Sequence, residues 1–176
     1  MNKLFGCLVV TISTIVLSGC TMSFRSTPDE YNGADAAHIR ISDEGNTVIR
    51  TYEMKDGCYK KVSEKRLTSA LAIMGVPTSG GKKVSGMTPS NDIKGLVVKE
   101  YSIKPLQKLS VVRYYTENHT YGSFNKEMSA LFYPQPNNDY DIIVGDYSIT
   151  VKNITPSNGK DSTWKGEICK TGLLDW

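Results

Sequence analysis

"AHIRISDEGNTVIRTYEM", residues 37–54, shows the pattern that decides the fold. Apolar and polar residues alternate through Ile39 and Ile41, the turn-rich segment 43–46 interrupts them, and the alternation resumes over residues 47–54. A period of two is typical of a half-buried strand, and Asp, Gly and Asn favour turns. The stretch therefore predicts two strands joined as a β-hairpin.

Further strand candidates share this composition, which is rich in Val, Ile, Tyr and Thr, residues that suit a pleated and half-buried surface. They are residues 58–62, 95–103, 109–117, 127–134, 140–154 (as two strands broken near Gly145-Asp146) and 164–170. Turn-rich stretches such as "PQPNND" and "PSNGKDS" separate several of them.

One segment departs from the alternation. Leu67, Leu71 and Met74 stand at helical spacing within residues 63–75, and Ser63 suits the start of a helix. About eight short strands with regular turn signals indicate a sandwich or a barrel. We expect a mainly β protein: an antiparallel β-sandwich or a small barrel with at most one short helix.

The start of the chain has the layout of a secretory signal peptide. Lys3 precedes the uncharged, largely apolar run of residues 4–17, and small Ser18 and Gly19 follow it. As a helix this run would extend about 21 Å, short of the ~30 Å hydrocarbon core of a bilayer. We therefore expect a signal peptide over residues 1–19, with an uncleaved anchor as the alternative.

"LSGC", residues 17–20, resembles the lipobox of bacterial lipoproteins. The resemblance implies cleavage before Cys20 and acylation of this residue, and two or more acyl chains give a stable membrane anchor. Thr21 stands where an Asp would retain an enteric lipoprotein in the inner membrane, so the resemblance implies the outer membrane, facing the periplasm. An accidental cysteine is the alternative.

The mature chain would contain 157 residues, a length that suits one domain with a substantial core. The polar stretch from Cys20 to residue 34 includes Pro28 and Gly33, and we expect it to be a flexible tether. Residues 35–176 would form the β-sandwich domain.

Two cysteines remain once Cys7 leaves with the signal peptide and Cys20 is acylated. In an oxidising compartment, the remaining Cys58 and Cys169 are expected to form a disulfide. A metal site is not expected, because zinc prefers four ligands and neither histidine of the chain has ligand spacing to a cysteine.

Charge and motifs exclude several classes of function. Without residues 1–19 the formal net charge is +2, and the longest basic runs are pairs, so no nucleic-acid partner is expected. Glu117, His119 and Ser123 lie too close in sequence to converge as a catalytic relay. His38 is expected to face solvent, and Asp139 and Asp141 are expected to be a strand-edge charge pair. We expect no catalytic residues and no cofactor.

A long loop runs from residue 76 to about residue 94, and it lacks the Lys that a phosphate-binding loop would carry after Gly80. Long loops in compact domains are often functional, so Gly80, Lys82, Lys83 and Met87 are candidate partner contacts. A plain solvent-exposed loop is the alternative.

The combination of lipobox, polar tether and β-rich domain resembles small Gram-negative lipoproteins that have no assigned activity. The resemblance implies a non-enzymatic binding or accessory module of the cell envelope, in contact with the bilayer and with an envelope protein. The alternative is an inhibitor of a lysozyme-like lytic enzyme, because "SGGKK", residues 79–83, faintly resembles the "SGxK"-like loop of such inhibitors.

Overall fold

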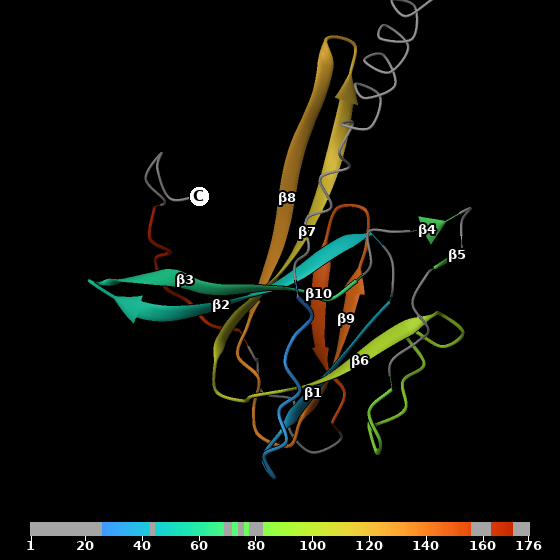
Figure 1. The fold of residues 1–176 in the computed structure, drawn as a ribbon, viewed down its shortest axis with the longest axis vertical. Helices are drawn as coiled ribbons and strands as arrows, with labels where there is room; N and C mark the ends of the chain where they lie inside the picture. Colours follow the sequence, from blue (N-terminus) through green and yellow to red (C-terminus); the bar gives the residue numbers. More distant parts are fainter. Residues whose placement is uncertain are drawn as a thin grey trace, which may run out of the picture.

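The computed structural model describes residues 26–42, 45–68, 72–73, 76–77, 83–155 and 163–170. In these residues two four-stranded sheets pack face to face, and no helix is present (Figure 1). The described strands form open sheets rather than a closed barrel. The prediction of a β-sandwich is therefore confirmed.

Sheet 1 has the strand order β10-β9-β1-β6. Its strands are β1 (Ala37–Ser42), β6 (Val98–Ile103), β9 (Asp139–Val144) and β10 (Ile149–Asn153). Strand β1 pairs antiparallel with β6 and parallel with β9, whereas β9 and β10 are antiparallel. The sheet is thus mixed, with β1 hydrogen-bonded on both sides.

Sheet 2 is fully antiparallel and has the order β3-β2-β7-β8. Its strands are β2 (Asn46–Lys55), β3 (Cys58–Arg66), β7 (Lys108–His119) and β8 (Gly122–Phe132). A separate two-stranded pair consists of β4 (Ala72–Ile73) and β5 (Val76–Pro77).

The hydrophobic core lies between the two sheets. Its buried residues are Ala37, Ile39, Ile41, Ile49, Leu67, Tyr101, Ile103, Leu109, Val111, Phe132, Tyr140 and Ile142. Within each strand these residues recur at every second position, so one face of each sheet supplies the core. The opposite face of sheet 1 is left for polar residues.

The predicted hairpin over residues 37–54 is wrong, although both of its strands exist. Strand β1 belongs to sheet 1 and β2 to sheet 2, so the two strands are not paired with each other. The neighbours of β1 are β6 and β9, and no side of β1 remains free for β2. Alternation reveals the buried face of a strand but not its partner.

The predicted helix over residues 63–75 is also wrong where the structure describes that segment. Ser63 to Arg66 continue β3 and pair with β2, and Ser63 Oγ donates to Thr51 Oγ1 instead of capping a helix. Leu67 is buried in the core. Cross-strand pairing here overrides the local helical spacing.

The turn and break signals elsewhere were informative. Asp56 and Gly57 both have positive φ and join β2 to β3 in a tight hairpin, between two of the predicted strand segments. The stretch 140–154 is split into β9 and β10 around Gly145, as predicted. Residues 164–170 do not form the predicted strand, because they contribute one isolated bridge, between Ile168 and Tyr59.

A disulfide joins Cys58 to Cys169, as predicted, and closes a sequence separation of 111 residues. Beside it, Tyr59 donates its backbone N–H to Glu167 O (2.8 Å) and accepts at its own carbonyl from Cys169 N (3.0 Å). The C-terminal segment is therefore held along the outer edge of β3.

Trp164 fixes the same segment to sheet 2. Its Nε1 donates to the carbonyl of Leu109 (2.7 Å), and its ring contacts those of Tyr52 and Tyr59. Lys108 Nζ lies 5.5 Å from the centroid of the Trp164 ring, within cation–π range. The C-terminal segment is thus held by the disulfide and also by the packing of Trp164 against sheet 2.

Residues 26–34, which belong to the expected tether, contact both sheets. Ser26 O accepts from Arg66 N at the end of β3 (2.8 Å), and Tyr31 N donates to Ser102 O on β6 (3.0 Å). From Ser26 onward the chain is therefore hydrogen-bonded to the domain.

We expect loss of the disulfide to destabilise the fold strongly. In the chain-entropy model, a closed loop of this length contributes about 4–5 kcal/mol to the free energy of unfolding. Urea denaturation of the unlipidated mature chain (Cys20→Ser) should therefore show a much lower midpoint when Cys58→Ser and Cys169→Ser are added. An unchanged midpoint would contradict the stabilising role of the disulfide.

Candidate functional site

The outer face of sheet 1 carries a row of ionisable side chains. On β1, His38 and Arg40 alternate with the core residues and point away from them. The register places Glu100 of β6 and Asp141 of β9 on either side of Arg40, and Asp139 beside His38. Neighbouring strands thus bring charges of opposite sign together on one face.

Arg40 lies at the centre of this charged cluster. Its Nε is 3.0 Å from Glu100 Oε1 and 3.8 Å from Asp141 Oδ1. The side chains of Arg40, Glu100 and Asp141 are 8%, 6% and 0% exposed. Charges removed from water to this extent need partners on every side, because their desolvation is costly.

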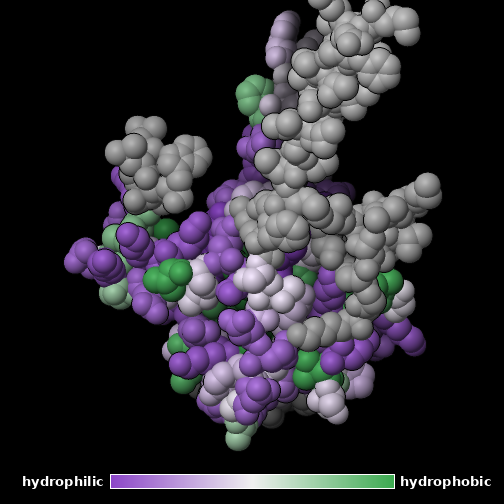
Figure 2. Space-filling view, in the orientation of Figure 1, coloured by the Kyte–Doolittle hydropathy of each residue, from purple (hydrophilic) through white to green (hydrophobic). Residues whose placement is uncertain are grey.

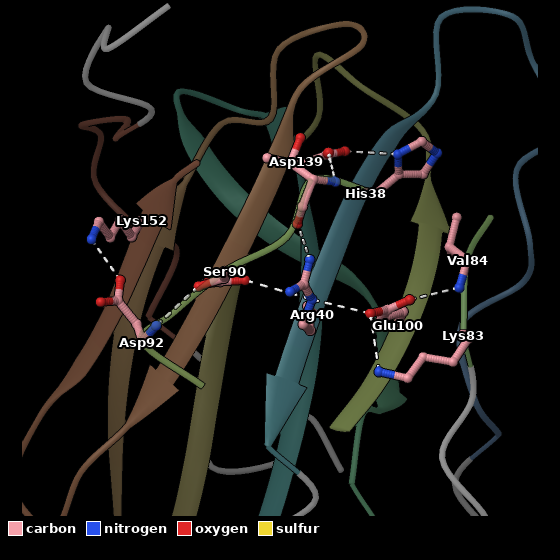
Figure 3. Close-up of polar contacts among 11 residues, drawn as sticks. His38, Arg40, Lys83, Val84, Ser90, Asp92, Glu100, Asp139 and Lys152 are labelled. Carbon is pink, nitrogen blue, oxygen red and sulfur yellow. Dashed lines mark hydrogen bonds and ion pairs between the residues drawn. The ribbon is translucent and has the colours of Figure 1, made fainter. Parts of the chain in front are cut away.

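The loop of residues 83–97 supplies further partners by crossing the outer face of sheet 1 (Figure 3). Glu100 Oε2 accepts from Val84 N (2.7 Å), and Asp139 Oδ2 accepts from Thr88 N (2.6 Å). The Arg40 guanidinium donates to the carbonyl of Thr88. Residues 83–97, here called the clasped loop, are therefore held by charge-assisted hydrogen bonds to their backbone.

Contacts at both ends of the clasped loop support this arrangement. Lys83 Nζ lies 3.5 Å from Glu100 Oε1 near its start, and Asp92 accepts from Lys152 of β10 (2.5 Å) farther along. Ile93 is 4% exposed and anchors the segment with an apolar side chain. The loop is thus attached to all four strands of sheet 1, including β1 through Arg40.

The two aspartates of β9 have opposite pKa shifts. Burial raises the pKa of Asp139, but hydrogen bonds from Thr88 and His38 outweigh it, and the pKa lies below its usual value. Burial also dominates at Asp141 and raises the pKa of that carboxyl, against the lowering effects of Ser90 and Arg40. Asp139 is therefore the carboxylate that stays ionised at lower pH.

The sequence-based expectations for these side chains were wrong. Asp139 and Asp141 do not form a strand-edge charge pair, because β9 lies inside sheet 1 and both residues are buried. His38 is partly buried rather than solvent-facing, with Nδ1 2.9 Å from Asp139 Oδ1. Alternation identified the outer face correctly, but a distant loop covers it.

The structure describes two of the four candidate contact residues of the long loop. Lys83 is exposed, and Met87 is half-buried against the domain. Gly80 and Lys82 lie outside the described residues, as do Cys20 and most of the "SGGKK" stretch. Sequence reasoning missed Leu96 and Val97, which are 47% and 54% exposed at the end of the clasped loop.

The other candidate constellation lies at the tip of the β7–β8 hairpin. His119 Nε2 is 3.4 Å from Glu117 Oε2, but Ser123 Oγ donates to Asn118 Oδ1 (2.7 Å) and not to the histidine. These three candidates of a relay do not converge. Among the described residues, no three His, Cys, Asp or Glu side chains are grouped to hold a metal ion.

The clasped loop binds three of the ionisable groups of the cluster, Arg40, Glu100 and Asp139. Arg40 is paired with carboxylates, and Glu100 and Asp139 each bind a loop N–H. The chemistry of the cluster is therefore to hold a loop in one conformation. The sequence signal for this cluster is the set of opposite charges at outward positions of several strands. These charges can be recognised as neighbours only once the strand register is known.

Polar side chains dominate the face of the molecule seen in Figure 2, and apolar residues are scattered over it. The part of the chain that the structure describes contains no helix long and apolar enough to span a bilayer. Comparisons with protein-family models, curated proteins and solved structures find no match to this chain.

We expect Asp139→Asn and Asp141→Asn to differ in sign and in pH dependence. Asp139→Asn removes the negative charge and one of the two carboxylate oxygens that bind Thr88 N and His38 Nδ1, and it should lower the free energy of unfolding at pH 7 by about 1–3 kcal/mol. Because the pKa of Asp139 is lowered in the folded state, its ionisation stabilises the fold at pH values above the unfolded pKa of ~3.9, and this stabilisation is lost as the pH falls further. The stability difference between Asp139→Asn and the parent should therefore shrink below about pH 4.

Asp141→Asn serves as the matched control on the same strand face. A raised pKa means that ionisation opposes folding, so this variant should gain stability relative to the parent as the pH rises above about 4. Urea denaturation between pH 3 and pH 7 measures both. Parallel pH profiles for the two variants would contradict the assignment.

Proposed function

We propose that this chain is a lipid-anchored module of a bacterial cell envelope that acts by binding a partner rather than by catalysis. In this proposal Cys20 carries the acyl chains, the outer membrane holds the anchor, and the β-sandwich faces the periplasm. The partner is an envelope protein.

The N-terminal sequence supports the anchoring. The short apolar run ends at "LSGC", and the two other cysteines of the mature chain are joined to each other. Cys20 is therefore left as the one unpaired thiol after signal-peptide removal. A disulfide between Cys58 and Cys169 also suits an oxidising compartment such as the periplasm.

The clasped loop is the observation that carries the binding proposal. Its backbone is fixed by Arg40, Glu100 and Asp139, yet Leu96 and Val97 are left half-exposed at its end. A preordered loop loses little conformational entropy on binding, which favours recognition through its exposed apolar side chains. Lys83 adds a positive charge at the other end of the loop.

The anchoring is testable by metabolic labelling. The wild-type chain should incorporate radiolabelled palmitate and fractionate with outer membranes, whereas Cys20→Ser should do neither, because the acylated thiol is gone. Cys58→Ser with Cys169→Ser serves as the control and should still be labelled. Equal labelling of the Cys20→Ser variant would reject the lipobox interpretation.

The binding role is testable by crosslinking in intact cells followed by detergent pull-down. A stoichiometric partner should be captured with the wild-type chain and lost with Leu96→Asp plus Val97→Asp, since buried charges disrupt an apolar contact. Met54→Asp plus Val62→Asp, at equally exposed apolar positions of the β2–β3 hairpin, should retain the partner.

Two other results would reject this surface. If both double variants retain the partner, the contact lies elsewhere on the domain. If no form captures a partner and the fold is intact, the accessory role is wrong, and inhibition of lysozyme-like enzymes by the purified protein becomes the next assay.

A further inference from the structure

The β7–β8 hairpin extends beyond the rest of sheet 2 as a two-stranded arm (Figure 1). The pairing of β2 with β7 ends at Tyr114, whereas β7 and β8 continue together through five more pairs, from Tyr115–Lys126 to His119–Gly122. Residues 115–126 are here called the arm. Five residues of antiparallel strand correspond to about 17 Å.

The base of the arm is firmly fixed to the domain. Arg50 of β2 donates to Tyr114 Oη (2.6 Å) on β7 and to Glu127 Oε2 (2.8 Å) on β8. It also binds Glu64 of β3 (2.7 Å). Arg50 therefore links both strands of the arm to β2 and β3 at the point where they leave the sheet, and these bonds fix the direction of the arm.

The end of the arm presents aromatic side chains to solvent. Tyr121 is 98% exposed in the turn, and Phe124 is 54% exposed on β8, with its ring centroid 5.7 Å from that of His119. Neither residue contributes to the hydrophobic core. Two-stranded ribbons are marginally stable in water and gain little from such exposed aromatic residues. These side chains are thus available for contact with another surface.

The charges of the arm are balanced. Lys126 Nζ lies 2.7 Å from Glu117 Oε2, and His119 Nε2 lies 3.4 Å from the same oxygen. The arm thus lacks the excess of basic residues that draws proteins to anionic surfaces. Its contact is expected to depend on the aromatic residues and not on electrostatic attraction.

The position of Ser26 relates the arm to the membrane anchor. Ser26 O is hydrogen-bonded to Arg66 N, and the register runs from Arg66 through Val48 to Val112 of β7. Ser26 follows Cys20 by six positions, so the anchor lies at most about 21 Å away. The tip of the arm lies about 24 Å beyond Val112 along β7.

The maximum reach of about 21 Å is close to the extension of about 24 Å, so acylated Cys20 and the tip of the arm can lie at the same bilayer surface. Tyrosine and other aromatic residues favour the membrane–water interface, where the ring is partly desolvated and the hydroxyl stays hydrated. We propose that the arm is a second membrane contact, in which Tyr121 and Phe124 insert into the interfacial layer of the bilayer that holds Cys20. This inference rests on the proposed lipid anchoring.

A fluorescent probe at the tip tests the contact in the lipidated protein. Tyr121→Cys, labelled with an environment-sensitive dye, carries the one free thiol of the mature acylated chain. In vesicles of phosphatidylethanolamine and phosphatidylglycerol, its emission should shift to the blue and be quenched by lipids with a spin label near the headgroup. Leu106→Cys, at the exposed β6–β7 connection, is the control and should stay in water.

A second measurement does not depend on the anchor. The unlipidated Cys20→Ser chain should partition weakly onto vesicles, and Tyr121→Ser plus Phe124→Ser should reduce the partition coefficient by roughly tenfold or more, because apolar burial is lost. Tyr147→Ser, which changes a tyrosine 92% exposed in the β9–β10 turn, should leave it unchanged. The effect should be the same with zwitterionic and with anionic vesicles.

Failure of the arm and failure of the anchor give different results. A lipidated protein that floats with the vesicles while the Tyr121 probe stays in water would overturn the proposal. A probe that is shielded only after envelope proteins are added would overturn it in favour of a protein contact. If the protein does not float with the vesicles, the anchoring proposal is wrong. The partition of the unlipidated chain, with and without Tyr121→Ser plus Phe124→Ser, then tests the membrane contact of the arm by itself.

Discussion

The buried guanidinium of Arg40, held between two carboxylates, is the constraint on which the rest of the structure depends. Strand β1 is hydrogen-bonded on both sides and presents Ile39 and Ile41 to the core. Arg40 cannot turn to solvent unless β1 slips by one residue, which would expose both isoleucines. Buried ion pairs persist only where further hydrogen bonds satisfy them, and backbone groups of the clasped loop provide these bonds. The register of β1 therefore dictates the position of a loop some fifty residues away.

The same register separates the surfaces available for binding. The inner faces of both sheets form the core, the clasped loop covers the outer face of sheet 1, and Trp164 packs on the outer face of sheet 2. The exposed end of the clasped loop and the arm both carry exposed apolar side chains, and they extend from different sheets. Because they are separate, the proposed contacts with a bilayer and with a partner protein do not compete for the same surface.

The strands were predictable because burial on one face leaves an alternating pattern in the sequence, and the disulfide followed from the number of cysteines. Strand partners were not predictable in this way. Residues 37–54 have the pattern of a hairpin, yet β1 pairs with strands that begin more than fifty residues downstream. The helical spacing of Leu67 was equally misleading, since one buried leucine fits the core from a strand end as well as from a helix. The charged cluster escaped prediction for a related reason: Asp139 and Asp141 have the spacing of solvent-facing residues, and only the loop that covers them reveals their role.

The order in which the two aspartates of β9 bind protons protects the clasped loop. Asp141 has the raised pKa and takes up a proton first as the pH falls, whereas Asp139 has the lowered pKa and stays ionised. Asp139 holds the loop backbone through Thr88 N, so neutralisation of Asp141 relieves a desolvated charge and leaves this bond intact. Arg40 meanwhile retains Glu100 as its nearer partner, at 3.0 Å against 3.8 Å for Asp141. Acidification thus neutralises Asp141 before Asp139, and the bond between Asp139 and Thr88 N is the later one to be lost.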